Sequence, residues 1–286
     1  ALWHSAQNVR AQSDYVCSAA YRVDETLPTG ARWEMCWEHR GLEGIVLHNS
    51  YLTPPGGPRR LVLASAKLAQ VHVPYDDNGA RFHDISDFGF GGQYLDNLGT
   101  ADCPNGALIL FGSKNVLCKQ VQGRGYAQKY YARDLQGYQL SLFSVSMSGD
   151  YNYITQWIFK DDGSIEPTMG AAGKLQRYGA DPQYGWRTAV NRIPISHYHN
   201  YWFRLDFDID GLANDRVEQI QFNPSDSNRR RTIAVEPILT ETARSHDPNV
   251  QRSWRITDMV TKNNEGNTIS YHIEWLTSGH QFNGPD

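Results

Sequence analysis

The stretch that most constrains the fold is 151–159, where large side chains recur at every second position. The positions on one side of this alternation are Tyr151, Tyr153, Thr155, Trp157 and Phe159. Because alternate side chains of a β-strand project from the same face, these residues would form one continuous, largely aromatic surface. Asp162-Gly163 follows, a dipeptide typical of a hairpin turn. We therefore predict a strand with a buried aromatic face that leads into an antiparallel hairpin.

The composition of the whole chain also favours β structure. The chain has 286 residues, of which 40% are hydrophobic, so it can bury a sizeable core in one or two domains. Tyrosine and tryptophan are frequent, whereas stretches rich in helix-forming residues are few. Segments bounded by turn residues predict further strands at 44–49, 61–75, 107–111, 139–146, 232–239 and 267–275. Many short strands of this kind predict an all-β protein built as an antiparallel sandwich.

Charge and hydropathy argue against two kinds of partner. The formal net charge is -4, which gives no electrostatic reason to expect nucleic acid binding. The short basic run 229–231 is more typical of a solvated loop than of a polyanion site. No apolar run is long enough to span a bilayer. We therefore expect neither a nucleic acid partner nor a membrane span.

The chain has four cysteines, which allow three disulfide pairings. None of them stands in a Cys-x-x-Cys pair typical of metal binding. We favour Cys17–Cys36 and Cys103–Cys118, since each bond closes a short loop and would contribute about 2–4 kcal/mol. The alternative is four buried thiols in a cytosolic protein. Disulfides would indicate an oxidising compartment, and thus a secreted or extracytoplasmic protein.

Two other stretches stand out on either side of the central strand. The upstream stretch, 82–91, reads Phe-His-Asp-Ile-Ser-Asp-Phe-Gly-Phe-Gly. The downstream stretch, 197–211, begins His-Tyr-His and continues with Phe-Arg-Leu-Asp-Phe-Asp-Ile-Asp-Gly. In this order and at this spacing, the three stretches resemble the catalytic domain of the copper amine oxidases. The resemblance implies a large, distorted antiparallel β-sandwich, which in the family is usually an obligate homodimer.

The resemblance does not cover the chain evenly. It is continuous from Gly41 onward, whereas residues 1–40 match poorly and are expected to be an N-terminal extension or the remnant of a preceding domain. Residues 41–286 would then form an incomplete sandwich, truncated before the C-terminal segment of the family. The family often has a disulfide in the region of Cys103 and Cys118, which supports the second of the two bridges.

His197 and His199 are the candidate metal ligands. They stand two apart, so on a strand both imidazoles would project from one face and reach one metal ion. Imidazole suits copper or zinc, and only the resemblance selects copper. The alternative is a pair of ordinary polar residues on a strand. The third copper histidine of the family has no counterpart here, so His246, His272 or His280, or a separate polypeptide, would have to replace it.

Tyr151 aligns with the tyrosine that the family oxidises to topaquinone, a conversion that requires bound copper and dioxygen. Its neighbours differ from the family pattern, in which Asn precedes the tyrosine and Asp or Glu follows it. Here Asp150 precedes and Asn152 follows, as if the two side chains were exchanged. We expect the exchange to place a negative charge beside the ring. The alternative is an ordinary buried tyrosine.

Asp84 aligns with the catalytic base, which takes the α-proton of the bound amine in the family. Partial burial beside aromatic residues would raise its pKa toward a useful value. The alternative is a loop aspartate that accepts hydrogen bonds from turn amides. By the same resemblance, Tyr75 would contact an oxygen of the cofactor, and Phe82 would stand at the channel gate.

Asp206, the carbonyl of Phe207, and Asp208 match a peripheral cation site that typically holds calcium in the family. Oxygen ligands of this kind suit a hard cation. Further ligands of that site lie in the segment that has no counterpart here. The alternative is a solvated acidic edge.

The resemblance implies oxidation of a small primary amine by dioxygen, giving an aldehyde, ammonia and hydrogen peroxide. The cofactors would be copper and topaquinone, with calcium as a further candidate. An oligomer or a second chain would complete the site. The alternative is an inactive relative that serves in binding or assembly. A third interpretation is a different reaction in the same pocket with Tyr151 unmodified, because a fold does not fix its chemistry.

Overall fold

The computed structural model describes residues 15–190, 192–223 and 232–275, and these residues form β-strands joined mostly by turns. Among the described residues, α1, Asp84–Asp87, forms a single α-helical turn. Within the described residues, no helix is long and apolar enough to cross a membrane. The basic run 229–231 and His280 lie outside the described residues.

The larger sheet has the strand order β1-β2-β3-β4-β13, and β5 also pairs with β4. Its strands are β1 Arg22–Thr26, β2 Arg32–Arg40, β3 Gly44–Thr53, β4 Arg60–Pro74, β5 Arg81–His83 and β13 Asn200–Phe207. All neighbours pair antiparallel. β13 comes from far along the chain, yet it lies beside β4, with Asn200 opposite His72. This pairing brings the segment before β13 to the end of β4.

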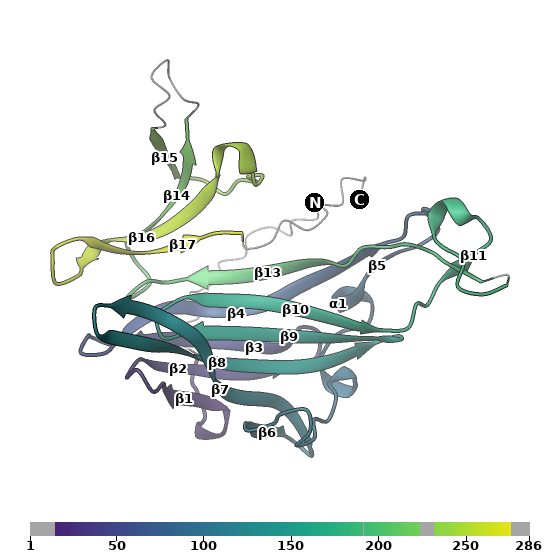
Figure 1. Ribbon diagram of the computed structural model, residues 1–286, viewed down its shortest axis with the longest axis horizontal. Coiled ribbons are helices and arrows are strands. Elements are labelled where there is room, and N and C mark those ends of the chain that lie inside the picture. Colours follow the sequence, from purple (N-terminus) through teal and green to yellow (C-terminus); the bar gives the residue numbers. More distant parts are fainter. Residues whose placement is uncertain (1–14, 191, 224–231, 276–286) are drawn as a thin grey trace.

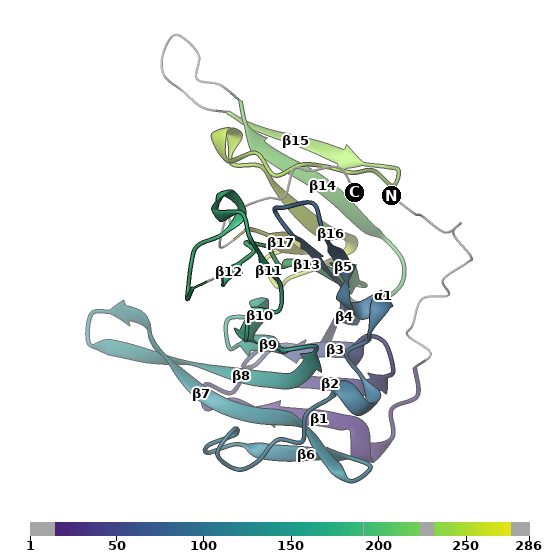
Figure 2. The same ribbon diagram turned by 90° about the vertical axis from the view of Figure 1, so that its right-hand side faces the viewer.

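The second sheet has the order β10-β9-β8-β7-β6. Its strands are β6 Ala107–Phe111, β7 Lys114–Tyr130, β8 Arg133–Ser148, β9 Tyr151–Lys160 and β10 Ile165–Gly173. The two sheets lie against each other, with β9 near the middle of the molecule (Figures 1 and 2). The expected antiparallel sandwich is therefore confirmed.

A smaller sheet of the order β15-β14-β16-β17 lies beside the sandwich (Figure 1). Its strands are β14 Asp215–Phe222, β15 Ile233–Ile238, β16 Ser253–Lys262 and β17 Thr268–Ile273, and a separate short pair consists of β11 Tyr178–Gly179 and β12 Ile193–Pro194. Tyr271 of β17 packs on Phe207 of β13 with ring centroids 5.9 Å apart. Its hydroxyl donates a hydrogen bond to the carbonyl of Gly163, at 3.1 Å. These contacts attach the small sheet to both layers of the sandwich.

The main core lies between the two large sheets. Buried residues of β1 to β4 meet buried residues of β7 to β9 there. Trp33 of β2 packs on Phe159 of β9 with ring centroids 5.0 Å apart, and its indole N–H donates to the carbonyl of Lys160 at 2.9 Å. Burial along β9 alternates over the whole strand, so the predicted aromatic face is the face that the core buries.

The strands predicted from the sequence are confirmed; β3 and β8 extend clearly beyond their predicted ends, whereas β15 and β17 are shorter than predicted. The segment 22–40 differs from the expectation of an extension outside the sandwich. It forms β1 and β2, and β2 pairs with β3 along most of its length. The physical reason is visible in the sequence, because Trp33, Met35 and Trp37 alternate and all three are buried. These strands are an integral part of the larger sheet.

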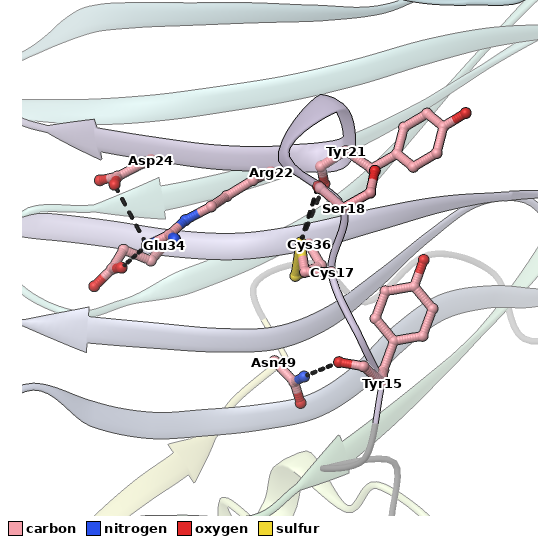
Figure 3. Close-up of a disulfide and its surroundings, with 9 residues drawn as sticks. All are labelled: Tyr15, Cys17, Ser18, Tyr21, Arg22, Asp24, Glu34, Cys36 and Asn49. Carbon is pink, nitrogen blue, oxygen red and sulfur yellow. Dashed lines mark hydrogen bonds and ion pairs between the residues drawn. A yellow bond between two sulfur atoms is a disulfide. The ribbon is translucent and has the colours of Figure 1, made fainter.

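Both favoured disulfides are present. Cys17–Cys36 attaches the segment before β1 to β2, as Figure 3 shows. Beside this bond, the Asn49 side chain donates to the carbonyl of Tyr15 at 3.2 Å (Figure 3). Cys103–Cys118 attaches the loop before β6 to β7 and lies in a small buried cluster of its own. The two bonds thus fix one loop or terminal segment on each large sheet.

We predict that Trp33→Ala lowers the free energy of unfolding by about 3–5 kcal/mol, since it opens a cavity between the sheets and removes the hydrogen bond to Lys160. Urea unfolding followed by far-UV circular dichroism would measure the change. Trp186→Ala is the control, because Trp186 is 58% exposed and its loss should change stability by no more than about 0.5 kcal/mol. Equal effects of the two substitutions would contradict this account of the core.

Candidate active site

The candidate site lies where β9 begins. Tyr151 and Tyr153 are the first two residues of the buried face of β9. They meet the segment that leads into β13, where His197 forms an isolated bridge with Tyr75 and His199 directly precedes the strand. The second sheet therefore supplies the phenols, and the larger sheet supplies the imidazoles and Tyr75. The two histidines stand in this extended segment rather than within a regular strand, but their rings lie together as expected, with centroids 4.9 Å apart.

Tyr151 contacts the histidine pair directly. Its hydroxyl lies 3.2 Å from Nε2 of His197, and the backbone N–H of Gln176 donates to that hydroxyl at 3.4 Å. Tyr75 stacks on the other side of His197, with ring centroids 4.6 Å apart. Burial, followed by the interaction with Tyr151, raises the pKa of the Tyr75 phenol. Tyr75 therefore stays protonated, and the sequence-predicted residues Tyr75, Tyr151 and His197 form one contact group.

The proton of His197 can be placed from its contacts. Nδ1 lies 3.2 Å from the carbonyl of Ile195, and a carbonyl only accepts hydrogen bonds, so Nδ1 carries the proton. The lone pair is then on Nε2, where the Tyr151 hydroxyl donates to it. Burial, and next the neighbouring His197, lower the pKa of His199 to about 4. His199 is thus neutral at neutral pH, which is the form that binds metals.

Asp84 lies on α1 and is 5% exposed. Its carboxylate accepts a hydrogen bond from the hydroxyl of Tyr153 at 2.7 Å. Burial raises the pKa of Asp84, and the hydrogen bond from Tyr153 opposes that rise. The turn-capping role that was the alternative for Asp84 belongs to Asp87, whose carboxylate accepts from the backbone N–H of His83 at 2.7 Å.

A pocket of about 30 Å³ brings these groups together. Its lining residues are Val73, Tyr75, Phe82, Asp84, Phe88, Ser148, Gly149, Tyr151, Tyr153 and Gln176. Half of the lining residues are aromatic, and the pocket has room for about one water molecule. A larger hollow of about 530 Å³ lies on the small sheet beside Val217 and Trp254, but none of the candidate site residues lines it. Of the two, the smaller pocket is therefore the one that the sequence-predicted residues Tyr75, Asp84 and Tyr151 line.

The two residues that flank Tyr151 do not lie as expected. Asp150 is exposed on the turn between β8 and β9, and its carbonyl accepts from the N–H of Lys174 at 3.1 Å. The side chain of Asn152 donates to the carboxylate of Asp96 at 3.1 Å. Alternation explains both positions, because residues on either side of Tyr151 face away from the site. The expected negative charge beside the ring is therefore an exposed charge on the turn.

No third histidine joins the pair in the part of the chain that the structure describes. His272 lies on β17 with Nε2 2.6 Å from the hydroxyl of Ser253, and His246 packs on Trp275. More generally, no group of three or more His, Cys, Asp or Glu side chains is arranged to hold a metal within residues 15–190, 192–223 and 232–275. Within these residues, neither His246 nor His272 therefore forms a three-ligand group with the histidine pair.

The absence of a three-ligand group among the described residues also bears on the calcium site expected at Asp206, Phe207 and Asp208. Burial, and next the charges of Asp206 and Asp215, raise the pKa of Asp208 to about 6. This rise indicates a carboxylate whose charge is not compensated by its neighbours. The side chain of Asp206 lies 3.5 Å from the hydroxyl of Ser65. Since the described residues hold no group of three such ligands, a calcium site is not supported.

Sequence reasoning missed two residues of the site. Tyr153 is fully buried, and its hydroxyl contacts both Asp84 Oδ2 and Nδ1 of His199, each at 2.7 Å. The signal was present in the sequence, because Tyr153 is two residues from Tyr151 and must share its face. Gln176 was also missed, and no local pattern could have placed it over Tyr151.

Curated proteins similar to this chain are primary amine oxidases. Primary amine oxidase 1 of Arabidopsis thaliana is 24% identical over 289 residues, which cover 85% of this chain and 44% of that protein. The primary amine oxidase of Klebsiella aerogenes is 24% identical over 257 residues, which cover 76% of this chain and 34% of that protein. The chain therefore spans less than half of the length of these relatives.

A solved structure has the same fold. The copper-containing benzylamine oxidase from Hansenula polymorpha superimposes with a TM-score of 0.74 at 17% sequence identity, over 94% of this chain and 47% of that one. At this identity the likeness concerns the fold alone. The family model described as the enzyme domain of copper amine oxidase matches residues 22–282. The match covers most of the chain, which therefore belongs to the copper amine oxidase family.

Proposed function

We propose that this chain forms the catalytic pocket of a copper- and topaquinone-dependent oxidase of small primary amines. The observation that carries the proposal is the contact between the Tyr151 hydroxyl and Nε2 of His197 in a pocket that Asp84 also lines. Around this contact a phenol, two imidazoles and a buried carboxylate lie close together, although they are far apart along the chain, and the phenol and the carboxylate line the pocket. Apart from the third copper histidine, this is the residue set that the resemblance implies. The reaction would convert the amine and dioxygen to an aldehyde, ammonia and hydrogen peroxide.

The residues present supply two ligands that suit a copper ion. His199 is neutral, the rings of His197 and His199 lie side by side, and imidazole suits Cu²⁺ by its chemistry. When bound, copper and the quinone formed from Tyr151 would supply the redox chemistry with dioxygen. A third ligand would have to come from a segment outside the described residues or from another chain. We therefore propose that an oligomer or a second polypeptide completes the site.

Asp84 would take the α-proton of the bound amine. Its burial beside Phe82 and Phe88 raises its pKa, so the carboxylate is a stronger base than a solvent-exposed aspartate. Tyr75 would hold the oxygen of the Tyr151 ring through its protonated phenol. Phe82 and Gln176 line the same pocket and would restrict the amine to small or flat molecules. Asp150 and Asn152 would act on Tyr151 only through the backbone of β9.

Two disulfides support an extracytoplasmic location, since such bonds form and persist in oxidising compartments. The second candidate function is a binding or assembly protein without oxidase activity. The absence of a third histidine near the pair, within the described residues, favours it. The two candidates differ in one chemical respect, which is the state of Tyr151.

We predict that the copper-loaded protein, held in air, becomes coloured through a visible absorption band that bleaches with ethylamine or benzylamine. Intact mass should show a gain of two oxygens and a loss of two hydrogens at Tyr151, because the ring whose hydroxyl contacts His197 would be oxidised. Tyr151→Phe should bind copper and stay colourless. A copper-loaded wild-type protein with no colour and an unchanged mass would leave only the non-oxidase function.

We also predict that Asp84→Asn lowers kcat/KM for ethylamine by about 10²- to 10⁴-fold, the usual effect of losing a general base. The measurement is peroxide release at equal copper content. Asp87→Asn is the matched control, because Asp87 lies on the same turn but accepts only from a backbone N–H, which an amide oxygen also does. Equal losses in the two variants would indicate damage to α1 rather than loss of a base.

A further inference from the structure

Tyr153 lies at the centre of the site but has no role in the proposed reaction. Its side chain is fully buried on β9, and its ring stacks on Phe90 with centroids 4.9 Å apart and an interplanar angle of 23°. Its hydroxyl lies 2.7 Å from Oδ2 of Asp84 and 2.7 Å from Nδ1 of His199. The hydroxyl thus connects the proposed base to a proposed metal ligand, and packing holds its ring in place.

The two short contacts determine where the protons are. A phenol has one proton to donate, and an ionised carboxylate can only accept. Tyr153 therefore donates to Asp84, and its oxygen is left to accept from His199. The donor in that second bond must be Nδ1–H of the imidazole. Burial and the hydrogen bond with Asp84 both raise the pKa of Tyr153, so its proton is retained.

We propose that Tyr153 is a positioning residue that holds His199 in the Nδ1–H tautomer, so that the Nε2 lone pair is the one offered to a metal ion. The inference rests on the proposed function, because it concerns the metal site of that reaction. His197 reaches the same tautomer by another route, through the carbonyl of Ile195. A hydrogen-bonded partner on the far nitrogen is the usual means of orienting a metal-binding histidine.

The same hydrogen bonds connect two functions of the pocket. If Asp84 instead carried a proton and donated it to Tyr153, the Tyr153 hydroxyl would donate to Nδ1 of His199. His199 would then carry its own proton on Nε2. In that state Asp84 is no base and His199 offers no lone pair toward the metal. The ionised Asp84 therefore supports metal binding at His199 and proton abstraction at the same time, and Tyr153 is the group through which it does so.

Nitrogen NMR of metal-free protein tests the tautomer without any activity. We expect wild-type protein labelled with ¹⁵N-histidine, at neutral pH, to show Nδ1 of His199 protonated and Nε2 unprotonated, with the signals assigned through a His199→Gln variant. An Nε2–H signal for His199 in the wild type would overturn the proposal. This measurement depends on no substitution at Tyr153, so a folding defect of a variant cannot obscure it.

Copper titration of Tyr153→Phe gives a second readout. The variant keeps the ring that stacks on Phe90 but lacks the hydroxyl, so we expect Nε2–H to appear on His199 and Cu²⁺ affinity to fall about 10- to 100-fold. Tyr201→Phe is the matched control, because the Tyr201 ring centroid lies 6.4 Å from those of both Tyr153 and His199, and its phenol should not affect either result. Wild-type affinity and an unchanged tautomer in Tyr153→Phe would overturn the proposal. If wild-type protein bound no Cu²⁺, the proposed function would lose its metal site, and the nitrogen signals would still decide the tautomer.

Discussion

The site depends on how one face of β9 packs against the opposite sheet. Trp157 and Phe159, toward the end of the strand, are buried in the main core, while Tyr151 and Tyr153, at its start, meet the histidine segment. Because all four side chains belong to one strand face, none can shift alone, and a register slip of one residue would turn every one of them away. Core packing by Trp33 therefore also sets the depth of the two phenols.

Local patterns in the sequence were sufficient for β9, because alternation over one segment states which side chains share a face. Trp33, Met35 and Trp37 alternate in the same way, and this alternation alone predicts the strand that joins the larger sheet. The expectation of an extension outside the sandwich rested on the poor match of residues 1–40 to the family. No local pattern could show that residue 197 lies against residue 151, since β13 reaches β4 only through long-range pairing. The expectation that these two residues lie together therefore came from the resemblance to the family and not from their spacing in the sequence.

The exchange of side chains around Tyr151 shows why motif comparison alone misleads. Gly149 has a φ of 59°, in the left-handed region that favours glycine. From this turn Asp150 is exposed, and Asn152 reaches Asp96, which lies 56 residues earlier in the chain. The carboxylate that was expected beside the ring is thus exposed on the turn and does not line the pocket. Only the fold of the turn reveals this, because Asp and Asn suit either position chemically.

The contacts around the histidine pair also limit how the site can be completed. Nε2 of His197 faces the Tyr151 hydroxyl, and the His199 ring lies beside the same phenol, with centroids 5.1 Å apart. On the other sides, Ile195 and Tyr153 occupy the Nδ1 atoms. A metal ion held by the pair would therefore have to approach from the side of Tyr151, and so would a third ligand from another segment or chain. Under the proposed function, completing the metal site and bringing the metal to the phenol would then be one geometric requirement, since Nε2 of His197 and the Tyr151 ring lie on one side of the pair.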